Sequence, residues 1–469
     1  MNERDSETIA GMLEELGFEK LGSDGRSDTK LRNTSDILVI NTCSIRENAD
    51  NKFFGILGQV KKFKESNPEK IVAVCGCMMQ QQSIVDTIKS KYNWVDIVFG
   101  THNIDEFPRL ISNVIAEKEK SYSVLDESLE IVEGLPAKRE YSFKAYVNIM
   151  YGCNNFCTYC IVPYTRGREK SRAPQDILDE IRSVCAEGAK EITLLGQNVN
   201  SYRGSGSLLN SEFLPQNTTN PPQSTVDFPD LLEMISEVEG LERIRFMTSH
   251  PKDLSDKLIK LYSTCEKLCP SIHLPIQSGS TEILRRMNRK YSKEDYLLLI
   301  EKLRVALPEI VITTDFIVGF PGETEEDFLE TLDVIRKVEF DSAFTFLYSP
   351  RNGTPASEYE EQIPEEVKHE RFNRMVELLN SITLKKNLEY LGRVETVLIE
   401  GWSKTRRDFL TGRTAGGKLV NIKATPDSNK ATATDSKKAT APDASLIGTI
   451  HNIRITDVNT FSFLGEVIY

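Results

Sequence analysis

The chain has 469 residues, of which 39% are hydrophobic and 27% are charged, and its formal net charge is −12. This composition is typical of a globular protein, and at roughly 150 residues per domain it predicts about three domains. The acidic balance disfavours nucleic-acid binding over the whole surface, though not at a local basic patch, and the lack of a long apolar run or a signal-peptide pattern leads us to expect a cytoplasmic protein with no membrane span.

The first segment alternates helical and strand patterns. An amphipathic helix is expected at residues 6–17, and short apolar strands at 36–40, 71–74 and 95–99. Such alternation predicts a parallel sheet, whose ligands gather beyond the carboxyl ends of the strands. Cys43 and Cys77 follow the first two strands and are candidate metal ligands, whereas Cys75 is better explained as a small buried strand residue.

Cysteine usage supports this interpretation. The chain contains nine cysteines. An odd number in a chain without an export signal disfavours a disulfide framework and favours metal binding or catalysis.

After a polar stretch at residues 117–140, strand and helix patterns alternate six times. Strands are expected at 143–150, 191–195, 243–247, 271–276, 311–316 and 342–347, and helices at 174–188, 229–238, 253–262, 281–287, 293–305 and 325–338. Six such units predict a partial barrel. Barrels of this kind keep their active sites at the carboxyl ends of the strands.

A dense cysteine motif follows the first strand of this barrel. Cys153, Cys157 and Cys160 have C-x3-C-x2-C spacing within one short loop. Thiolates are the usual protein ligands of a four-iron cluster, and three of them leave one iron open to an amine and a carboxylate of a small molecule. A zinc site is the alternative, but zinc prefers four closed ligands, often including His, and no His lies near this loop.

The cysteine loop resembles the signature of radical S-adenosylmethionine (SAM) enzymes, and residues 157–169 resemble the methylthiotransferase branch that modifies tRNA. This resemblance covers all three domains. It implies that the cluster cleaves SAM to a 5′-deoxyadenosyl radical, which removes hydrogen from carbon 2 of N6-isopentenyladenosine next to the tRNA anticodon. Sulfur would come through an auxiliary cluster, and the methyl group from a second SAM.

Two other functions remain open. A sibling enzyme would methylthiolate threonylcarbamoyl-adenosine in tRNA or an aspartate of a ribosomal protein. A non-catalytic iron–sulfur protein that binds RNA is a further alternative.

The family resemblance also implies a third auxiliary cysteine in the first domain. Cys43 and Cys77 match two of the three ligands, but the remaining one would lie just ahead of the segment that begins at Met1. Either the sequence starts late, or the auxiliary cluster is incomplete, or Cys75 fills the position. We prefer the first interpretation, because the opening helix would otherwise lack the strand that should precede it.

Polar and glycine-rich loops at the predicted strand ends supply candidate SAM-binding residues. They are Gln197, Ser249 and Gln277, to which we add Tyr159 of the cysteine loop. Ordinary turn chemistry is the alternative explanation, since the same residue types populate turns. Residues 203–227 interrupt the barrel pattern and are expected to form a surface insertion.

The last segment follows a charged helical region at residues 364–390. Short strands at 394–400, 409–411, 419–422, 447–455 and 465–469 predict a small closed barrel, and residues 425–445 a low-complexity loop. Residues 400–404 and 410–414 resemble the TRAM domain, an RNA-binding barrel. Trp402, Lys404 and Arg413 here, and Arg166 and Arg168 after the cysteine loop, are candidate RNA contacts, with solvated turns as the alternative.

Together these patterns predict an α/β protein of three domains: an N-terminal domain at residues 1–118, a partial (β/α)6 radical SAM barrel at 138–385, and a TRAM-like β-barrel at 388–469. The cofactors implied by the resemblance are SAM and two [4Fe-4S] clusters. The expected partners are tRNA, an electron donor and a source of sulfur. We expect a monomer.

Overall fold

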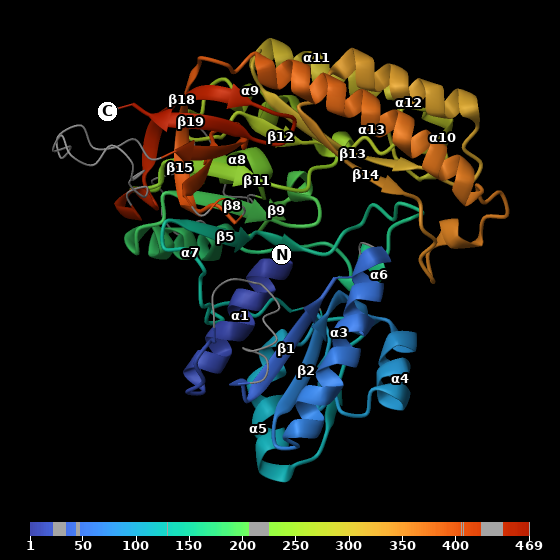
Figure 1. Ribbon diagram of the computed structural model, residues 1–469, viewed down its shortest axis with the longest axis vertical. Coiled ribbons are helices and arrows are strands. Elements are labelled where there is room, and N and C mark those ends of the chain that lie inside the picture. Colours follow the sequence, from blue (N-terminus) through green and yellow to red (C-terminus); the bar gives the residue numbers. More distant parts are fainter. Residues whose placement is uncertain are drawn as a thin grey trace, which may run out of the picture.

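The computed structural model describes residues 1–21, 34–43, 47–128, 130–205, 225–404, 406, 408–423 and 444–468. The insertion expected at 203–227 and the low-complexity loop expected at 425–445 lie largely outside these ranges. Figure 1 shows an N-terminal α/β domain below a central sheet-and-helix domain, with a small β-barrel packed against the side of the latter. Within the described ranges, no helix has both the length and the apolar character needed to cross a membrane.

A parallel sheet with strand order β1-β2-β3-β4 forms the centre of the N-terminal domain. Its strands are β1 (Ile37–Thr42), β2 (Ile71–Gly76), β3 (Ile97–Phe99) and β4 (Ser121–Ser123). Helices α3 (Glu47–Ser66) and α4 (Gln82–Lys91) pack on one face, and α1 (Asn2–Glu15) and α5 (Phe107–Glu117) on the other. The predicted strands and parallel sheet are confirmed. Strand β4 was missed because it lacks an apolar run.

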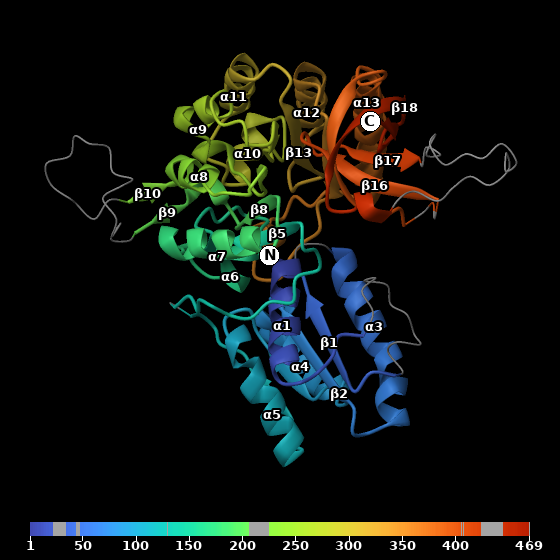
Figure 2. The ribbon, with the colours of Figure 1, turned by 90° about the vertical axis from the view of Figure 1, so that its left-hand side faces the viewer.

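The central domain contains parallel strands in the orders β11-β8-β5 and β12-β13-β14, joined by a bridge between Ile244 and Leu268. The strands are β5 (Lys144–Asn148), β8 (Glu191–Leu195), β11 (Arg243–Phe246), β12 (Ser271–His273), β13 (Val311–Val318) and β14 (Ser342–Leu347). The covering helices are α7 (Pro174–Ala186), α8 (Phe228–Ser236), α9 (Asp256–Leu261), α10 (Thr281–Arg286), α11 (Lys293–Ala306), α12 (Glu325–Val338) and α13 (Glu365–Leu388). Figure 2 shows these helices along the outside of the strands. The predicted partial barrel is confirmed.

Alternate side chains of the central strands point to opposite faces. Val147, Leu194 and Ile312 belong to the large apolar core beneath the helices. The neighbouring Tyr146 and Thr193 are paired across β5 and β8 and face the concave side. The barrel therefore keeps its polar and half-buried residues on the inside.

The C-terminal domain is a closed barrel with strand order β15-β16-β17-β19-β18. Its strands are β15 (Val394–Trp402), β16 (Phe409–Thr414), β17 (Leu419–Lys423), β18 (Ile450–Val458) and β19 (Phe463–Val467). Arg243 donates to the carbonyl of Thr396 at 2.8 Å, and Arg245 to that of Thr414 at 2.7 Å. The small barrel thus docks on the amino ends of the central strands.

A half-buried carboxylate holds the N-terminal and central domains together. Glu180 of α7 accepts from Arg4 of α1 at 3.0 Å, from Arg139 at 2.9 Å and from Arg172 at 2.6 Å. The first arginine belongs to the N-terminal domain and the second to the connecting segment. This hub fixes α1 against the central domain.

Candidate functional site

The cysteine loop lies between β6 (Met150–Tyr151) and α6 (Val162–Thr165), beyond the carboxyl end of β5. Gly152 opens it with a φ of 74°, and a Cβ at that position would meet the carbonyl oxygen of Arg168 at 2.0 Å. Thr158 donates from its backbone to Met287 at 3.1 Å, and Asn288 donates to the carbonyl of Phe156 at 2.9 Å. Contacts with the end of α10 therefore fix the shape of the loop.

The three thiols of the loop share one electrostatic environment. Burial raises the pKa of Cys160 to about 12, and the charges of Cys157 and Cys153 add to that effect. Burial likewise raises the pKa of Cys153 to about 11, with Cys157 contributing. Cluster ligands must be deprotonated, so binding iron here would release protons. Three thiols in one loop suit an iron–sulfur cluster, in which each thiolate binds a different iron.

Arg289 is a site residue that the sequence analysis did not identify. Its side chain is buried and places Nη1 at 3.4 Å from the Cys157 sulfur and at 3.5 Å from the Tyr159 hydroxyl. Its Nη2 donates to the carbonyl of Pro275 at 2.6 Å. This cation faces the cysteine loop from the end of α10. No local sequence pattern distinguishes it from a surface arginine.

The predicted SAM-binding residues lie on the same side of the barrel. Gln197 follows β8, Ser249 follows β11, and Gln277 lies in a bridge with Phe316 of β13. Ser249 and Gln277 are buried, and Tyr159 is half-buried within the cysteine loop. The structure therefore gathers all four around the carboxyl ends of the strands.

Several polar atoms in this region are buried without a hydrogen-bond partner in the described structure. They are Gln197 Oε1, Asn198 Oδ1, Ser249 Oγ and both amide atoms of Asn200. Burying a polar group without a partner costs free energy, so such groups are rare unless a ligand satisfies them. A polar molecule with amine, carboxylate and hydroxyl groups, as SAM has, fits this donor and acceptor set.

The second pair of candidate ligands lies at the edge of the N-terminal sheet. Thr42 pairs with Gly76 at the ends of β1 and β2, so Cys43 and Cys77 are the next residues on neighbouring strands. Cys77 is buried, and burial raises the pKa of its thiol. Cys75 is also buried and packs in the apolar core on the α1 and α5 side. Among the described residues, no three potential ligands gather closely enough for a single metal ion.

Arg166 connects these two cysteine sites. It follows α6, is only 6% exposed, and donates from Nε to the Cys77 sulfur at 3.1 Å and from Nη2 to Asp5 at 2.6 Å. Because its guanidinium is buried and paired, the prediction that it contacts RNA is wrong. Arg168, two residues further on, is exposed and lies over the Phe156 ring at 4.3 Å.

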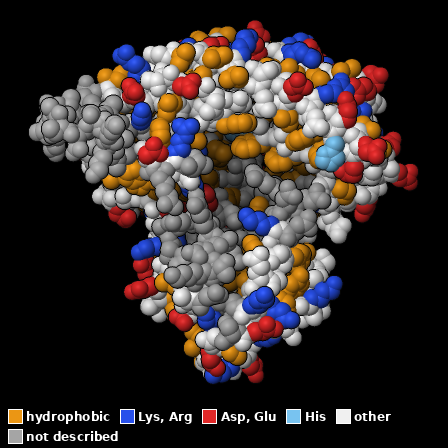
Figure 3. All heavy atoms as spheres, viewed as in Figure 1, with side chains coloured by type: hydrophobic (Ala, Val, Ile, Leu, Met, Phe, Trp, Pro, Cys, Tyr) orange, Lys and Arg blue, Asp and Glu red, His pale blue; other side chains and the backbone are white. Residues whose placement is uncertain are grey.

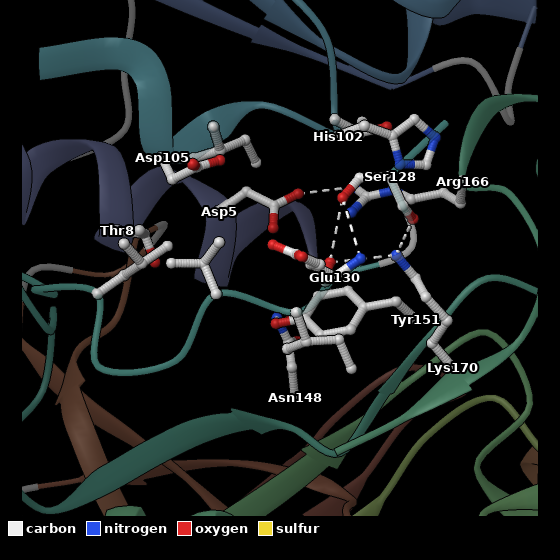
Figure 4. Close-up of a pocket in the computed structure, with 15 residues that line it drawn as sticks. Asp5, Thr8, His102, Asp105, Ser128, Glu130, Asn148, Tyr151, Arg166 and Lys170 are labelled. Carbon is white, nitrogen blue, oxygen red and sulfur yellow. Dashed lines mark hydrogen bonds and ion pairs between the residues drawn. The ribbon is translucent and has the colours of Figure 1, made fainter. Parts of the chain in front are cut away.

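A pocket of about 100 Å³ adjoins this arginine between the N-terminal and central domains (Figure 4). Asp5, His102, Tyr151 and Lys170 are among the residues that line it. Burial, followed by the charges of Lys170 and Arg166, lowers the pKa of His102 to about 4. The histidine is therefore neutral at physiological pH.

The predicted RNA contacts of the small barrel fall into two groups. Trp402 at the end of β15 is 43% exposed, and Lys404 is exposed two residues later. Arg413 of β16 pairs with Leu398, whereas Trp402 pairs with Leu410. Arg413 also lies 3.7 Å from the carboxylate of Glu400. It is therefore separated along the strands from the other two.

Comparison with known proteins agrees with the fold. Residues 147–335 match the radical SAM superfamily, residues 1–100 match a family described as uncharacterized protein family UPF0004, and residues 388–468 match the TRAM domain. A tRNA-2-methylthio-N(6)-dimethylallyladenosine synthase from Clostridium beijerinckii is 49% identical over 467 residues, which cover 100% of this chain and 93% of the relative. A synthase of the same name from Clostridium botulinum strain Hall is 50% identical over 471 residues, covering 100% of this chain and 95% of the relative.

A solved structure shares the fold at low sequence identity. The radical S-adenosylmethionine methyltransferase TsrM from Kitasatospora setae matches with a TM-score of 0.53 and 15% identity, covering 75% of this chain and 73% of that one.

Proposed function

The chain belongs to the tRNA-2-methylthio-N6-dimethylallyladenosine synthases, a family of radical SAM methylthiotransferases, and on this premise we propose that it adds a methylthio group to carbon 2 of N6-isopentenyladenosine beside the tRNA anticodon. The observation that carries this proposal is that the three thiols of the cysteine loop and several unpaired buried polar atoms lie at the same end of the barrel strands. When bound, the clusters and SAM supply the radical, the sulfur and the methyl group.

In this proposal the residues of the chain hold and orient the cofactors. Cys153, Cys157 and Cys160 are the ligands of the SAM-binding [4Fe-4S] cluster. Asn198 and Ser249 pair with polar groups of SAM, since their own buried oxygens lack partners. Gln197, Gln277 and Tyr159 complete the surroundings. Arg289 donates a hydrogen bond to the Cys157 sulfur, and its positive charge partly offsets the negative charge of the thiolates.

An auxiliary [4Fe-4S] cluster is the second part of the proposal. Cys43 and Cys77 supply two of its ligands from neighbouring strand ends. Sulfur and electrons must then come from partners.

Recognition of tRNA is assigned to both ends of the central barrel. The small barrel docks at the amino ends of β5, β8 and β11, whereas the cysteine loop lies at the carboxyl ends. Trp402, Lys404 and Arg413 contact the RNA at the first end, and Arg168 at the second. One chain carries the proposed RNA contacts at both ends of the barrel, so we propose that it acts as a monomer. We also propose that it works in the cytoplasm, where tRNA is modified.

The concave face of the barrel carries polar side chains, but two exposed apolar side chains on it offer a surface for an apolar substrate group. Met247 and Phe344 are 44% and 51% exposed, and the register of β13 and β14 places Phe344 beside Asp315 on that face. Figure 3 shows a hollow between the two larger domains with hydrophobic side chains along its rim. An isopentenyl group buries well against such surface, and a threonylcarbamoyl group or an aspartate side chain does not.

Expression in a bacterial strain that lacks its own synthase tests the proposal. Nucleosides from its tRNA are expected to contain 2-methylthio-N6-isopentenyladenosine when the native chain is supplied, and only N6-isopentenyladenosine with Cys157→Ala. Methylthiolated threonylcarbamoyl-adenosine, or a modified ribosomal aspartate, would support the sibling activities instead. Absence of 5′-deoxyadenosine from the purified protein with SAM and a reductant would support a non-catalytic RNA-binding role.

A further inference from the structure

Asp315 lies in the middle of β13, on the concave face of the barrel. Along this strand Ile312 and Phe316 belong to the apolar core beneath the helices. The alternate residues Thr313 and Asp315 are only half-buried. Because successive side chains of a strand point to opposite faces, this second set faces the concave side. The carboxylate is therefore presented to the inside of the barrel and not to the helices that cover it.

A histidine on the neighbouring strand holds this carboxylate. β12 pairs with β13 so that His273 stands opposite Thr313. His273 Nε2 lies 3.4 Å from Asp315 Oδ1, and Nδ1 lies 3.0 Å from the Thr313 hydroxyl. With the proton on Nε2 facing the carboxylate, Nδ1 accepts the hydroxyl hydrogen of Thr313. The contacts of the ring thus use both nitrogens and orient one oxygen of Asp315.

The second carboxylate oxygen, Oδ2, is left for a partner from outside the chain. The side chain of Asp315 is 23% exposed, and in the part of the chain that the structure describes no lysine or arginine forms an ion pair with it. A carboxylate offers about four acceptor positions, of which the histidine takes one. The remaining positions are open to an N–H or O–H donor that enters the concave side.

An exposed aromatic ring lies next to this acceptor. β13 and β14 pair in parallel with Asp315 opposite Phe344, which is 51% exposed, and neighbouring strands lie about 4.8 Å apart. The Phe344 ring also meets the His273 ring edge-on, with the centroids 6.0 Å apart. A hydrogen-bond acceptor and an apolar surface therefore stand side by side. N6-isopentenyladenosine has the complementary pair, since its N6 carries one hydrogen and one apolar group of five carbons.

We propose that Asp315 is a specificity-determining residue of the proposed reaction: its carboxylate accepts the N6–H of the substrate adenosine, while the isopentenyl group lies against Phe344. This role rests on the proposed function. A site built around an acceptor rejects a substrate without the matching donor, because the polar group of the site then loses its partner. A hydrogen bond to a charged group changes affinity by about tenfold to a hundredfold.

The depth of Asp315 separates it from the residues proposed to hold SAM. Gln197 and Ser249 lie in loops beyond the carboxyl ends of β8 and β11. Asp315 precedes the end of β13 at Val318 by a distance of about 10 Å, at the rise of a strand. It therefore lies deeper in the barrel than those loops, and its partner is assigned to the substrate and not to SAM.

The experiment compares the binding of two anticodon stem-loop RNAs to the full-length chain reconstituted with iron and sulfide. One RNA carries N6-isopentenyladenosine, and the other has an ether oxygen in place of N6–H, so that the apolar group is kept and the donor is lost. Dissociation constants are measured by fluorescence anisotropy without reductant, so that no turnover occurs. The native chain should bind the N6–H RNA at least about tenfold more tightly, whereas Asp315→Leu should bind both RNAs alike. Asp333→Leu on α12, at a position that is 45% exposed, is the control and should keep the native preference.

Asp315→Asn separates a direct contact from a structural role. Its amide can donate to the ether oxygen that the native carboxylate repels, so this variant should bind the ether RNA more tightly than the native chain does. A residue that only supported β13 would weaken the binding of both RNAs equally. The same variant decides the question if the melting temperature shows that Asp315→Leu does not fold.

Equal affinity of the native chain for the two RNAs would overturn the proposal, as would a preference that survives Asp315→Leu or an unchanged affinity of Asp315→Asn for the ether RNA. Loss of 5′-deoxyadenosine formation by Asp315→Asn with SAM and reductant, in the absence of RNA, would assign the residue to SAM instead. The nucleosides of the complemented strain judge the proposed function separately. Methylthiolated product together with equal affinities refutes only the role of Asp315, and an N6–H preference without that product refutes the proposed function while the contact with N6–H stands.

Discussion

The carboxylate of Glu180 joins the two domains that build the site, and its neutralisation gives a quantitative prediction. Its side chain is 16% exposed and accepts from Arg4, Arg139 and Arg172 at 2.6 to 3.0 Å. Removing one partner of a buried ion pair costs about 3–5 kcal/mol. Because a glutamine side chain still accepts one hydrogen bond, we expect Glu180→Gln to cost about 3 kcal/mol.

Urea unfolding measures this cost, with Asp179→Asn as the control. Asp179 neighbours Glu180 on α7, but its side chain is 60% exposed and pairs with Arg182 on the surface, where an ion pair contributes about 0–1 kcal/mol. With a urea dependence of about 3 kcal/mol/M, Glu180→Gln should lower the midpoint by about 1 M. Equal shifts of the urea midpoint in the two variants would refute the conclusion that Glu180 joins the two domains.

The pH dependence of the same contact has a definite sign. Burial opposes ionisation of Glu180, but Arg172 and Arg4 outweigh it and hold its pKa below the ordinary value. The stabilising contribution is therefore fully present above the unfolded-state pKa of about 4.3 and is lost as the pH falls through the lower folded-state pKa. Glu180→Gln should lose less stability than the native chain on acidification.

Three other predictions concern the site. Gly152→Ala should abolish iron binding by the cysteine loop, because its Cβ would meet the Arg168 carbonyl at 2.0 Å; Gly134→Ala, also at positive φ but with open space around it, should retain iron in the same assay. Phe344→Ala should raise KM for isopentenylated tRNA about tenfold, the equivalent of about 1.4 kcal/mol of apolar contact, whereas Leu329→Ala on the outer helix α12 should leave KM unchanged. Burial raises the pKa of Glu169 to about 7, so stability should fall as the pH rises through 7; Glu169→Gln should remove that fall, as measured by melting temperatures at pH 6 and pH 8.

Local sequence pattern was sufficient for most of the fold. The central strands carry apolar residues at alternate or neighbouring positions and lie between amphipathic helices, and each predicted strand and helix of the barrel is present. Ser292 and Thr324 form capping boxes with Asp295 and Asp327, so the starts of α11 and α12 are specified within four residues. Patterns of this kind are local and can be recognised without tertiary information.

Contacts between distant segments were beyond such reasoning. Arg166 lies in a dense basic run that reads as an RNA-binding surface, yet its partners Asp5 and Cys77 are 161 and 89 residues away. Arg289 approaches Cys157 across 132 residues. Neither arginine differs in sequence from an exposed one. Burial and pairing depend on how the domains pack, which the spacing of residues within one segment does not encode.

The proposed activity of this chain is methylthiolation of N6-isopentenyladenosine in tRNA. The most direct test offers the reconstituted full-length protein, with SAM and a reductant, an equimolar mixture of tRNA bearing N6-isopentenyladenosine and tRNA bearing threonylcarbamoyl-adenosine, followed by mass spectrometry of the nucleosides. We predict conversion of the isopentenylated nucleoside alone. Conversion of the threonylcarbamoylated nucleoside, or formation of 5′-deoxyadenosine with neither nucleoside changed, would contradict the account.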